Sequence, residues 1–599
     1  MWCFASWTTR TPKCRWGKSS RKAFSGHSAG KTHSGSERNE NKTERTAGDS
    51  LPVCSKMAWY DEAFFYHIYP LGLCGAPKTN PYGDEEHRLR ELWPWVEHLE
   101  RLGVTGLYIG PLFESGSHGY DTTDYRRLDR RLGSNADLKD FVRHCHDHGI
   151  RVVLDAVFNH SGRDFFAFRD LKERREQSAY KEWYCGVNFW NNNEFGDGFS
   201  YDNWGGYNLL AKFNLRNPQV VNYHLETVRY WVSEFDIDGL RLDTADVLDF
   251  DFMRALRGLA NSVKPEFWLM GEVIHGEYQR WVNPGMLHAV TDYALHKALF
   301  SGHNDHNYFE IAHTLNRFMQ NGIDCRTLYS FVDNHDVERI HTKLNDKRQW
   351  LPVHILLFCL PGIPSVYYGS EFGIDGRKTR GGSDDEIRPC LKLNELLSEE
   401  NPCLEIIRAL GKIYREEKTL ARGEYQQLVL TTKQYAFHRD DILVAVNNDG
   451  CACEISIPCA DGVYRGALHG GSVRAENGRL TLHLGACDGE ILIPESRSTA
   501  RYEPIRTSVS EAKAEAEQAP VTAPLRETAA AAAEGLLPQA KEDRTLDLSK
   551  PYEQMSVEEL QAAILQKLAH NGPVTDQMRR DVAANIWRDS LLNWVKSFR

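Results

Sequence analysis

The sequence predicts an α/β protein: a (β/α)8 TIM barrel with an inserted subdomain after strand 3, a C-terminal antiparallel β-sandwich domain and a short C-terminal helical hairpin. Three observations lead to this fold class. Between residues 60 and 410, short apolar runs alternate with amphipathic helical patterns. A long segment rich in aromatic residues, Asn and Gly interrupts the alternation after the third run. Short alternating runs divided by turn residues then follow up to about residue 497.

Eight runs are interpreted as barrel strands because each is apolar, rich in β-forming residues and followed by polar or acidic residues. In chain order they are AFFYHIYP, GLYIGP, IRVVLDAVFNH, IDGLRLD, FWLMGEV, AVTDYAL, TLYSFVDNHD and IPSVYYGSE. We assign residues 57–160 to the first part of the barrel and residues 213–410 to the remainder. Residues 161–212 form the inserted domain.

The remaining segments differ from the barrel in composition. Residues 1–56 are basic and rich in Ser, Gly and Thr, so we expect them to be disordered, or to lie upstream of a true start at Met57. Residues 411–497 carry the β-sandwich, and residues 498–550 form a linker rich in Ala, Glu and Pro. Residues 551–599 contain two amphipathic patterns, which predict the helical hairpin.

Composition excludes some classes of partner. The net charge of −11 argues against nucleic acid or an anionic membrane as partner. No apolar run reaches membrane-spanning length, and the N-terminal MWCFASW is too short for a secretory signal core. The 14 Cys are scattered without metal-ligand spacing, which favours reduced thiols and a cytoplasmic location. The oligomeric state stays open.

Ionisable residues, with one asparagine among them, gather at the ends of four predicted strands, where TIM barrels carry their chemistry. These residues are Asp155, Asn159 and His160 on the third strand, Arg241 and Asp243 on the fourth, Glu272 on the fifth, and His335 and Asp336 on the seventh. A single strand-end Asp is usually a helix cap or an ion-pair partner. Their joint occurrence predicts a catalytic mouth.

The carboxylates differ in their sequence surroundings, and this suggests different roles. Arg241 shares a strand face with Asp243, so the pKa of Asp243 should fall and favour a nucleophile. Glu272 follows the apolar FWLM and has no basic neighbour in its strand, so a raised pKa should favour a general acid. Such a pair is typical of retaining glycoside hydrolysis. Asp336 would support the charged transition state, and His160 and His335 would bind sugar hydroxyls.

Four segments, DAVFNH, GLRLDTAD, GEVI and FVDNHD, resemble the signature regions of the α-amylase family, glycoside hydrolase family 13. HGYDTTDY and PGIPSVYYGSE are similar to further stretches of that family, so the resemblance covers roughly residues 58–495. It implies Asp243 as nucleophile, Glu272 as general acid/base and Asp336 as transition-state stabiliser. It also implies sugar contacts from Tyr120, His160, Arg241 and His335. Asn159 resembles a calcium ligand or a structural residue; no other cofactor is implied.

Two details refine the resemblance. LAKFNLRNP is nearest to the fifth motif of cyclomaltodextrinases and neopullulanases. Asp246 and Val247 stand where secreted α-amylases have Lys-His, which argues against an endo-amylase of long polymers and against the usual calcium site.

The leading hypothesis is a retaining hydrolase of α-1,4-glucosidic bonds in maltodextrins, cyclodextrins or related α-glucan oligosaccharides. An α-glucosyl transferase or phosphorylase would use the same catalytic residues and is the alternative. A non-catalytic glucan-binding scaffold is disfavoured because all three acids are present.

Overall fold

The computed structural model describes residues 57–378, 383–497, 502, 505, 552 and 559–565. The segment 1–56, almost all of the linker and most of the predicted hairpin lie outside these residues. The chain divides into two units, Met1–Ala519 and Pro520–Arg599. In the second unit residues 559–565 are helical, with Leu560 and Ile564 buried. All that follows concerns the first unit.

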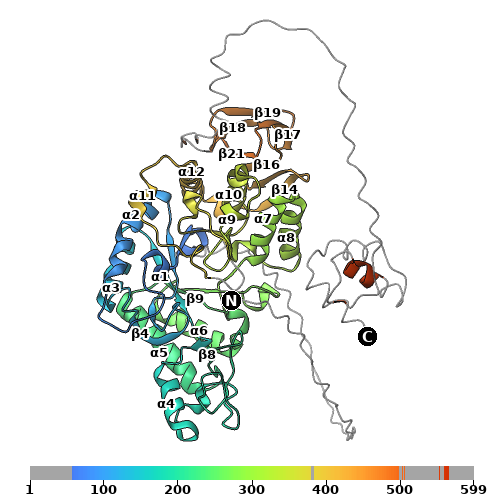
Figure 1. Ribbon diagram of the computed structural model, residues 1–599. Helices are drawn as coiled ribbons and strands as arrows, with labels where there is room; N and C mark the ends of the chain where they lie inside the picture. The colour runs from blue at the N-terminus through green and yellow to red at the C-terminus, as the bar shows by residue number, and fades with distance from the viewer. Residues whose placement is uncertain are drawn as a thin grey trace, which may run out of the picture. The chain divides into compact units, whose positions relative to one another are not determined.

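A closed barrel of eight parallel strands forms the centre of the first unit (Figure 1). Around the barrel the order is β1-β13-β12-β11-β10-β9-β5-β2. The strands are β1 (Phe65–Ile68), β2 (Gly106–Ile109), β5 (Arg151–Ala156), β9 (Gly239–Leu242), β10 (Trp268–Gly271), β11 (Ala289–Thr291), β12 (Leu328–Phe331) and β13 (Ile363–Tyr367). Each lies within one of the eight predicted runs, so the barrel prediction is confirmed.

Helices surround the barrel, and several begin at side-chain caps. Ser134 forms a capping box, Asn217 precedes a proline in the first turn, and Asp249 accepts two backbone N–H bonds. The longer helices are α2 (Trp93–Leu102), α3 (Asn135–Asp147), α5 (Pro218–Phe235), α6 (Phe250–Val263), α7 (Tyr293–Asn304), α8 (Tyr308–Gln320), α10 (Trp350–Cys359) and α12 (Pro402–Glu416). Short helices are α1 (Pro70–Leu73), α9 (Ile340–Lys343), α11 (Leu393–Leu396) and α13 (Thr419–Arg422).

Alternation along each strand separates two cores. Inward-facing residues such as Phe65, Trp268 and Met270 fill the barrel as one buried cluster. Leu240 and Leu242 belong instead to the larger cluster that includes residues of the surrounding helices. Arg241 therefore faces the barrel interior, where its guanidinium lies 5.7 Å from the ring centre of Tyr108.

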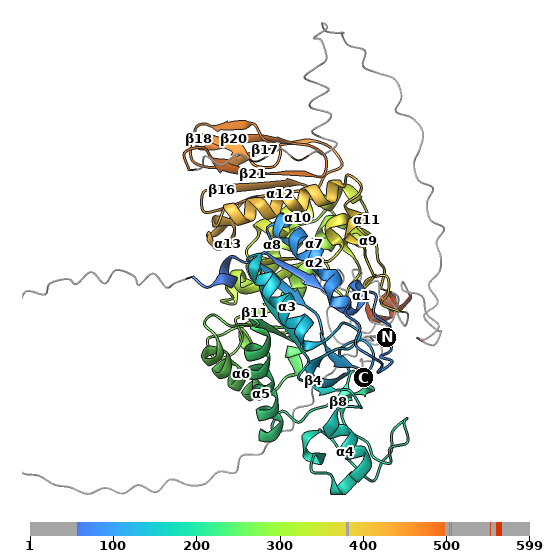
Figure 2. The same cartoon turned by 90° about the vertical axis from the view of Figure 1, so that its left-hand side faces the viewer.

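The insert after β5 contains helix α4 (Phe166–Arg174) and a small antiparallel sheet of order β6-β8-β7. Its strands are β6 (His160–Ser161), β7 (Asn203–Trp204) and β8 (Tyr207–Lys212). The insert projects from the barrel at the end opposite the C-terminal sheets (Figure 2). An antiparallel pair, β3 (Phe113–Ser115) and β4 (Thr122–Leu128), lies in the loop after β2.

The C-terminal region is antiparallel, with a six-stranded sheet of order β14-β15-β16-β21-β18-β19 and a two-stranded sheet of β17 and β20. Its strands are β14 (Tyr425–Leu430), β15 (Gln434–Arg439), β16 (Ile442–Asn447), β17 (Cys453–Pro458), β18 (Gly462–Gly466), β19 (Ser472–Ala475), β20 (Arg479–Leu484) and β21 (Asp488–Pro494). The sheet begins later than residue 411, because the apolar stripe of α12 continues the helix to Glu416.

Two further predictions can be compared with the described part of the chain. No helix in it is long and apolar enough to cross a membrane. The cysteines that it contains are all free, as the scattered spacing predicts.

Candidate active site

One arginine joins three carboxylates at the mouth of the barrel. Nη1 of Arg241 donates to both oxygens of Asp155, at 2.8 and 3.0 Å, and to Oδ1 of Asp243 at 2.9 Å. Its Nη2 lies 2.8 Å from Oε2 of Glu272. The carboxylates come from three adjacent strands, β5, β9 and β10. The side chains of Asp243 and Glu272 are less than a tenth exposed.

The surroundings of Glu272 are more polar than the sequence predicts. Besides the ion pair with Arg241, its Oε2 accepts the backbone N–H of Thr244 at 3.0 Å. Its Oε1 accepts the hydroxyl of Tyr293 at 3.3 Å. The expectation of apolar surroundings is therefore wrong, although Glu272 has no basic neighbour in its own strand, as expected. The basic neighbour comes from the adjacent strand, which reading one strand at a time cannot reveal.

The prediction of a lowered pKa for Asp243 is also wrong. Burial raises the pKa of Asp243 well above its ordinary value; Arg241 opposes this rise, and Glu272 and Asp155 add to it. One guanidinium is shared by three carboxylates, so its charge does not compensate for all of them. Burial and the neighbouring carboxylates therefore favour the protonated form of Asp243 itself.

Asp336 is the carboxylate that the site keeps ionised. Burial alone would raise its pKa, but contacts with His335, Arg388 and Lys378 lower the pKa well below its ordinary value. Oδ2 lies 3.1 Å from Nε2 of His335, and Oδ1 accepts from Nη2 of Arg388 at 2.8 Å. Lys378 donates to the backbone carbonyl of Asp336 at 2.7 Å. Asp336 can therefore present a negative charge to a developing cation.

Tyr120 connects the two groups of acids. Its hydroxyl donates to Oδ2 of Asp155 at 3.1 Å and lies 2.5 Å from Nε2 of His335. Its ring stacks on the ring of His335 with centres 5.7 Å apart. Tyr108 donates a second hydroxyl to Asp155 at 2.9 Å. These bonds fix the positions of Tyr120 and His335 beside the catalytic acids.

His160, like Asn159, Arg241 and His335, is a predicted site residue that is buried. It is fully buried, its Nε2 lies 3.1 Å from the carbonyl of Tyr120, and its Nδ1 lies 3.1 Å from Nδ2 of Asn159. Burial lowers the pKa of His160 to about 3, so the ring is neutral. In this arrangement His160 holds the backbone of Tyr120.

The contacts of Asn159 bear on its expected role as a calcium ligand. Its Oδ1 is buried without a hydrogen-bond partner, and its carbonyl accepts the N–H of Phe213 at 2.9 Å. Calcium in proteins is held by six to eight oxygens, several of them from carboxylates. Among the residues with described positions, no group of three or more His, Cys, Asp or Glu side chains could hold a metal ion. The described residues therefore offer no carboxylate-rich calcium site at Asn159.

Several residues of the site were not predicted. Arg388, Lys378 and Asp384 follow β13, where Nη2 of Arg388 lies 3.1 Å from Asp384. Their charges sit in a loop without periodicity, so no sequence pattern places them. Tyr108 and Tyr293 could have been suspected from the sequence. A buried Tyr near an acidic strand end usually needs a hydrogen-bond partner for its hydroxyl.

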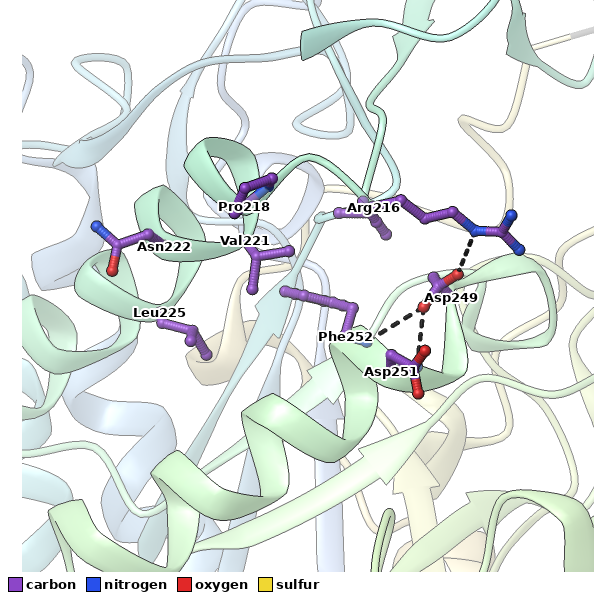
Figure 3. A pocket seen from close by; sticks show the side chains of 9 residues that line it. Arg216, Pro218, Val221, Asn222, Leu225, Asp249, Asp251 and Phe252 are labelled. Carbon is purple, nitrogen blue, oxygen red and sulfur yellow. Dashed lines mark hydrogen bonds and ion pairs between the residues drawn. The ribbon is translucent and has the colours of Figure 1, made fainter. Parts of the chain in front are cut away.

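A surface hollow of about 620 Å³ lies elsewhere, between the N-terminal turns of α5 and α6 (Figure 3). Leu215, Val221 and Phe252 contribute apolar surface, and Arg216 pairs with Asp249 at 3.0 Å. Asp249 also caps α6, as the dashed lines in Figure 3 show. None of the predicted site residues lines this hollow, and its acids serve structural contacts. The catalytic candidate is the cluster in the barrel mouth.

The cluster has the parts needed for retaining glycoside hydrolysis. One oxygen of Asp243 and one of Glu272 contact the same guanidinium, so the two carboxyl groups lie near each other. This suits the short carboxyl separation of about 5 to 5.5 Å in retaining enzymes. Three donors, from Arg241, Thr244 and Tyr293, hold the carboxylate of Glu272 in place. Asp336 supplies an ionised third carboxylate.

Comparison with known proteins agrees with this geometry. Residues 89–412 match the model of the α-amylase catalytic domain. A cyclomaltodextrinase from a Bacillus species is 30% identical over 447 residues, which cover 70% of this chain and 78% of the relative. A maltogenic α-amylase from Bacillus acidopullulyticus is 29% identical over 464 residues, covering 72% of this chain and 78% of the relative.

A solved cyclomaltodextrinase structure superimposes with a TM-score of 0.65 and 27% identity, covering 72% of this chain and 78% of that chain. The match extends over the barrel mouth where the three acids lie. From its catalytic-domain match and its relatives, the chain belongs to the α-amylase family of glycoside hydrolases.

Proposed function

We propose that this glycoside hydrolase cleaves α-1,4-glucosidic bonds of maltodextrins, cyclodextrins or related α-glucan oligosaccharides with retention of configuration. The observation that carries the proposal is the Arg241 cluster, which brings Asp243 and Glu272 together beside the ionised Asp336. The printed names of the relatives, cyclomaltodextrinase and maltogenic α-amylase, support this substrate class.

In the first step the carboxylate of Asp243 attacks the anomeric carbon, and protonated Glu272 gives its proton to the leaving glycosidic oxygen. The first product departs and a glycosyl ester remains on Asp243. In the second step Glu272 removes a proton from water, which attacks the anomeric carbon and releases Asp243. Asp336 and His335 bind the sugar at the reacting centre, and the charge of Asp336 stabilises its cationic character.

Asp246 favours water or sugar over phosphate as acceptor. Burial and the neighbouring Glu272 raise the pKa of Asp246 to about 6. Above that pH, Asp246 is a second negative charge beside the acid/base, and it disfavours a phosphate anion. A phosphorylase is therefore the weaker alternative, whereas transfer to another sugar remains compatible with this surface.

Product profiling tests the proposal. The enzyme is incubated with maltotetraose, a cyclodextrin and pullulan, and maltotetraose is repeated with phosphate or with added glucose. We expect glucose and short maltodextrins, with the α-anomer released first in the NMR spectrum. Glucose 1-phosphate as main product, products mainly longer than the substrate, or first release of the β-anomer would each contradict retaining hydrolysis.

Two accompanying properties are also proposed. The free cysteines of the described chain support a reducing, cytoplasmic location. Activity without calcium is the second property, in keeping with the Asp246–Val247 pair at the position where secreted α-amylases have Lys-His. Neither property enters the mechanism.

A further inference from the structure

The inserted domain presents one tryptophan almost entirely to solvent. The side chain of Trp190 is 95% exposed, the highest value for a large hydrophobic residue in the described chain. It lies in a loop that Asn188 and Ser200 close by exchanging two backbone hydrogen bonds, at 2.9 and 3.0 Å. Exposure of a full indole to water is unfavourable. A ligand that covered this indole would therefore gain binding free energy from its burial.

The loop is held firmly although its tip is exposed. Arg175 donates to the carbonyls of Asp197 and Gly198 at 2.8 and 2.7 Å, and Arg163 pairs with Asp197 at 2.8 Å. Gly198 has φ +74°, and a Cβ there would lie 2.3 Å from Nη1 of Arg175. The backbone N–H of Trp190 is fixed by Oδ1 of Asn188 at 2.9 Å. A pre-organised loop loses little entropy when a ligand binds.

More apolar surface lies on the same domain. Phe195, Tyr207 and Leu209 are 45, 36 and 48% exposed. A hydrogen bond between Glu194 and Asn208 joins the loop to β8, the strand that carries Tyr207 and Leu209. We call Trp190, Phe195 and Tyr207 the insert aromatic surface.

The polar groups of this loop fit a neutral ligand with many hydroxyls. Asn188 and Asn191 are exposed amides that can donate to and accept from hydroxyl groups. The charged groups of the loop are engaged with each other or with amides, as in Arg163 with Asp197 and Glu194 with Asn208. An aromatic face packs against the apolar face of a pyranose ring, and the amides match its hydroxyls.

We propose that the insert aromatic surface binds a stretch of α-glucan outside the barrel mouth, with Trp190 as its stacking platform. The identity of the glucan rests on the proposed function; the binding surface itself rests on the loop. Bound there, a long chain would be retained on the same molecule as the catalytic mouth.

Affinity electrophoresis in gels containing soluble starch tests the surface, with all proteins carrying Asp243→Asn so that the polysaccharide is not consumed. Adding Trp190→Ala should weaken retardation by roughly three- to tenfold in dissociation constant. Trp190→Phe should keep most of it, because it retains a stacking face. Phe309→Ala is the matched control, since Phe309 is 48% exposed on α8 and should leave retardation unchanged. In otherwise wild-type enzyme, Trp190→Ala should lower the ratio of kcat/KM on starch to that on maltotriose.

Equal retardation of the parent and Trp190→Ala proteins would overturn the inference. A smaller native mass for Trp190→Ala in size-exclusion chromatography would also overturn it, because Trp190 would then join two copies of the chain. If the wild type hydrolyses no α-glucan while starch retardation still depends on Trp190, the proposed function fails and the surface stands.

Discussion

Arg241 holds Asp243 and Glu272 through different nitrogens of one guanidinium, at 2.9 and 2.8 Å. The proposed nucleophile and the proposed acid/base therefore share a single positive charge, and Asp155 shares it too. A change in the protonation of one carboxyl changes the field at the others. The protonation of Asp243 therefore depends on Arg241 and on both neighbouring carboxylates.

Replacing Asp243 by Asn should reduce kcat by about a thousandfold or more, because the amide cannot form the glycosyl ester. The melting temperature should stay equal or rise, since the substitution removes one of three carboxylates that compete for Arg241. Reducing-sugar release and circular dichroism measure the two effects. Asp251→Asn is the control, as Asp251 is an exposed carboxylate at the start of α6. Activity above a tenth of the wild type would contradict the role of Asp243.

Replacing Arg241 by Met should cost about 3 to 5 kcal/mol of unfolding free energy, because three buried carboxylates lose their cation. The loss should grow as pH rises. The folded pKa of Asp243 is already above its ordinary value, and removing Arg241 raises it further. Urea unfolding at pH 5 and pH 8 measures this. Arg254→Met removes an exposed pair with Asp251 and should cost under about 1 kcal/mol. An equal loss at both pH values would be evidence against the shared-charge account.

Asp238, which directly precedes β9, should stabilise the folded protein at all but strongly acidic pH. Burial acts to raise its pKa, but hydrogen bonds from His146 and the N–H of Val152 lower the pKa to about 2. Because the folded pKa is depressed, the contribution of about 2 kcal/mol is present above pH 4 and is lost as pH falls towards 2. Thermal melts from pH 6 to pH 2.5 should show a steeper decline for the wild type than for Asp238→Asn. Parallel declines would rule this contribution out.

Asp246→Asn should shift the alkaline limb of kcat/KM to lower pH. Above pH 6 the wild-type side chain is a negative charge beside Glu272, and such a charge favours the protonated acid/base. The amide removes that support. Initial rates on maltotriose between pH 5 and 9 measure the limb. Glu277→Gln is the control, since it removes the same charge at an exposed position in the loop after β10. It should leave the alkaline limb unchanged. A shift in the opposite direction would show that Asp246 does not act on Glu272.

Dialysis against EDTA should leave both kcat and the melting temperature unchanged. Among the described residues, no group of three or more carboxylate, His or Cys side chains could hold the ion. A rise in melting temperature when calcium is added back would identify a site that Asn159 helps to form.

The fold was largely predictable, because each barrel strand carries its signal locally. Apolar runs with β-branched and aromatic residues predicted all eight strands, including short β11, whose run AVTDYAL is weak in isolation. Residue 411, taken as the start of the sheet domain, lies inside α12, whose apolar stripe continues to Glu416. The positions of Asp243, Glu272 and Asp336 were also predictable, since each follows a strand.

The electrostatics of the site could not be predicted from single strands. Arg241 and Asp243 are two residues apart, but the contact with Glu272 crosses to the next strand, and Arg388 reaches Asp336 from 52 residues away in sequence. The balance between burial and ion pairing depends on these neighbours. It reversed the expected direction of the pKa of Asp243 and left Asp336 as the firmly ionised acid.

The arginine cluster also ties β5, β9 and β10 together at their carboxyl ends, where each strand contributes one carboxylate. Its loss would remove a cross-link between neighbouring strands as well as an electrostatic aid to chemistry. Selection for a sound barrel would therefore preserve Arg241 even after selection for sugar cleavage ended. A descendant that had become a scaffold would be expected to lose Glu272 or Asp336 first and to keep the arginine.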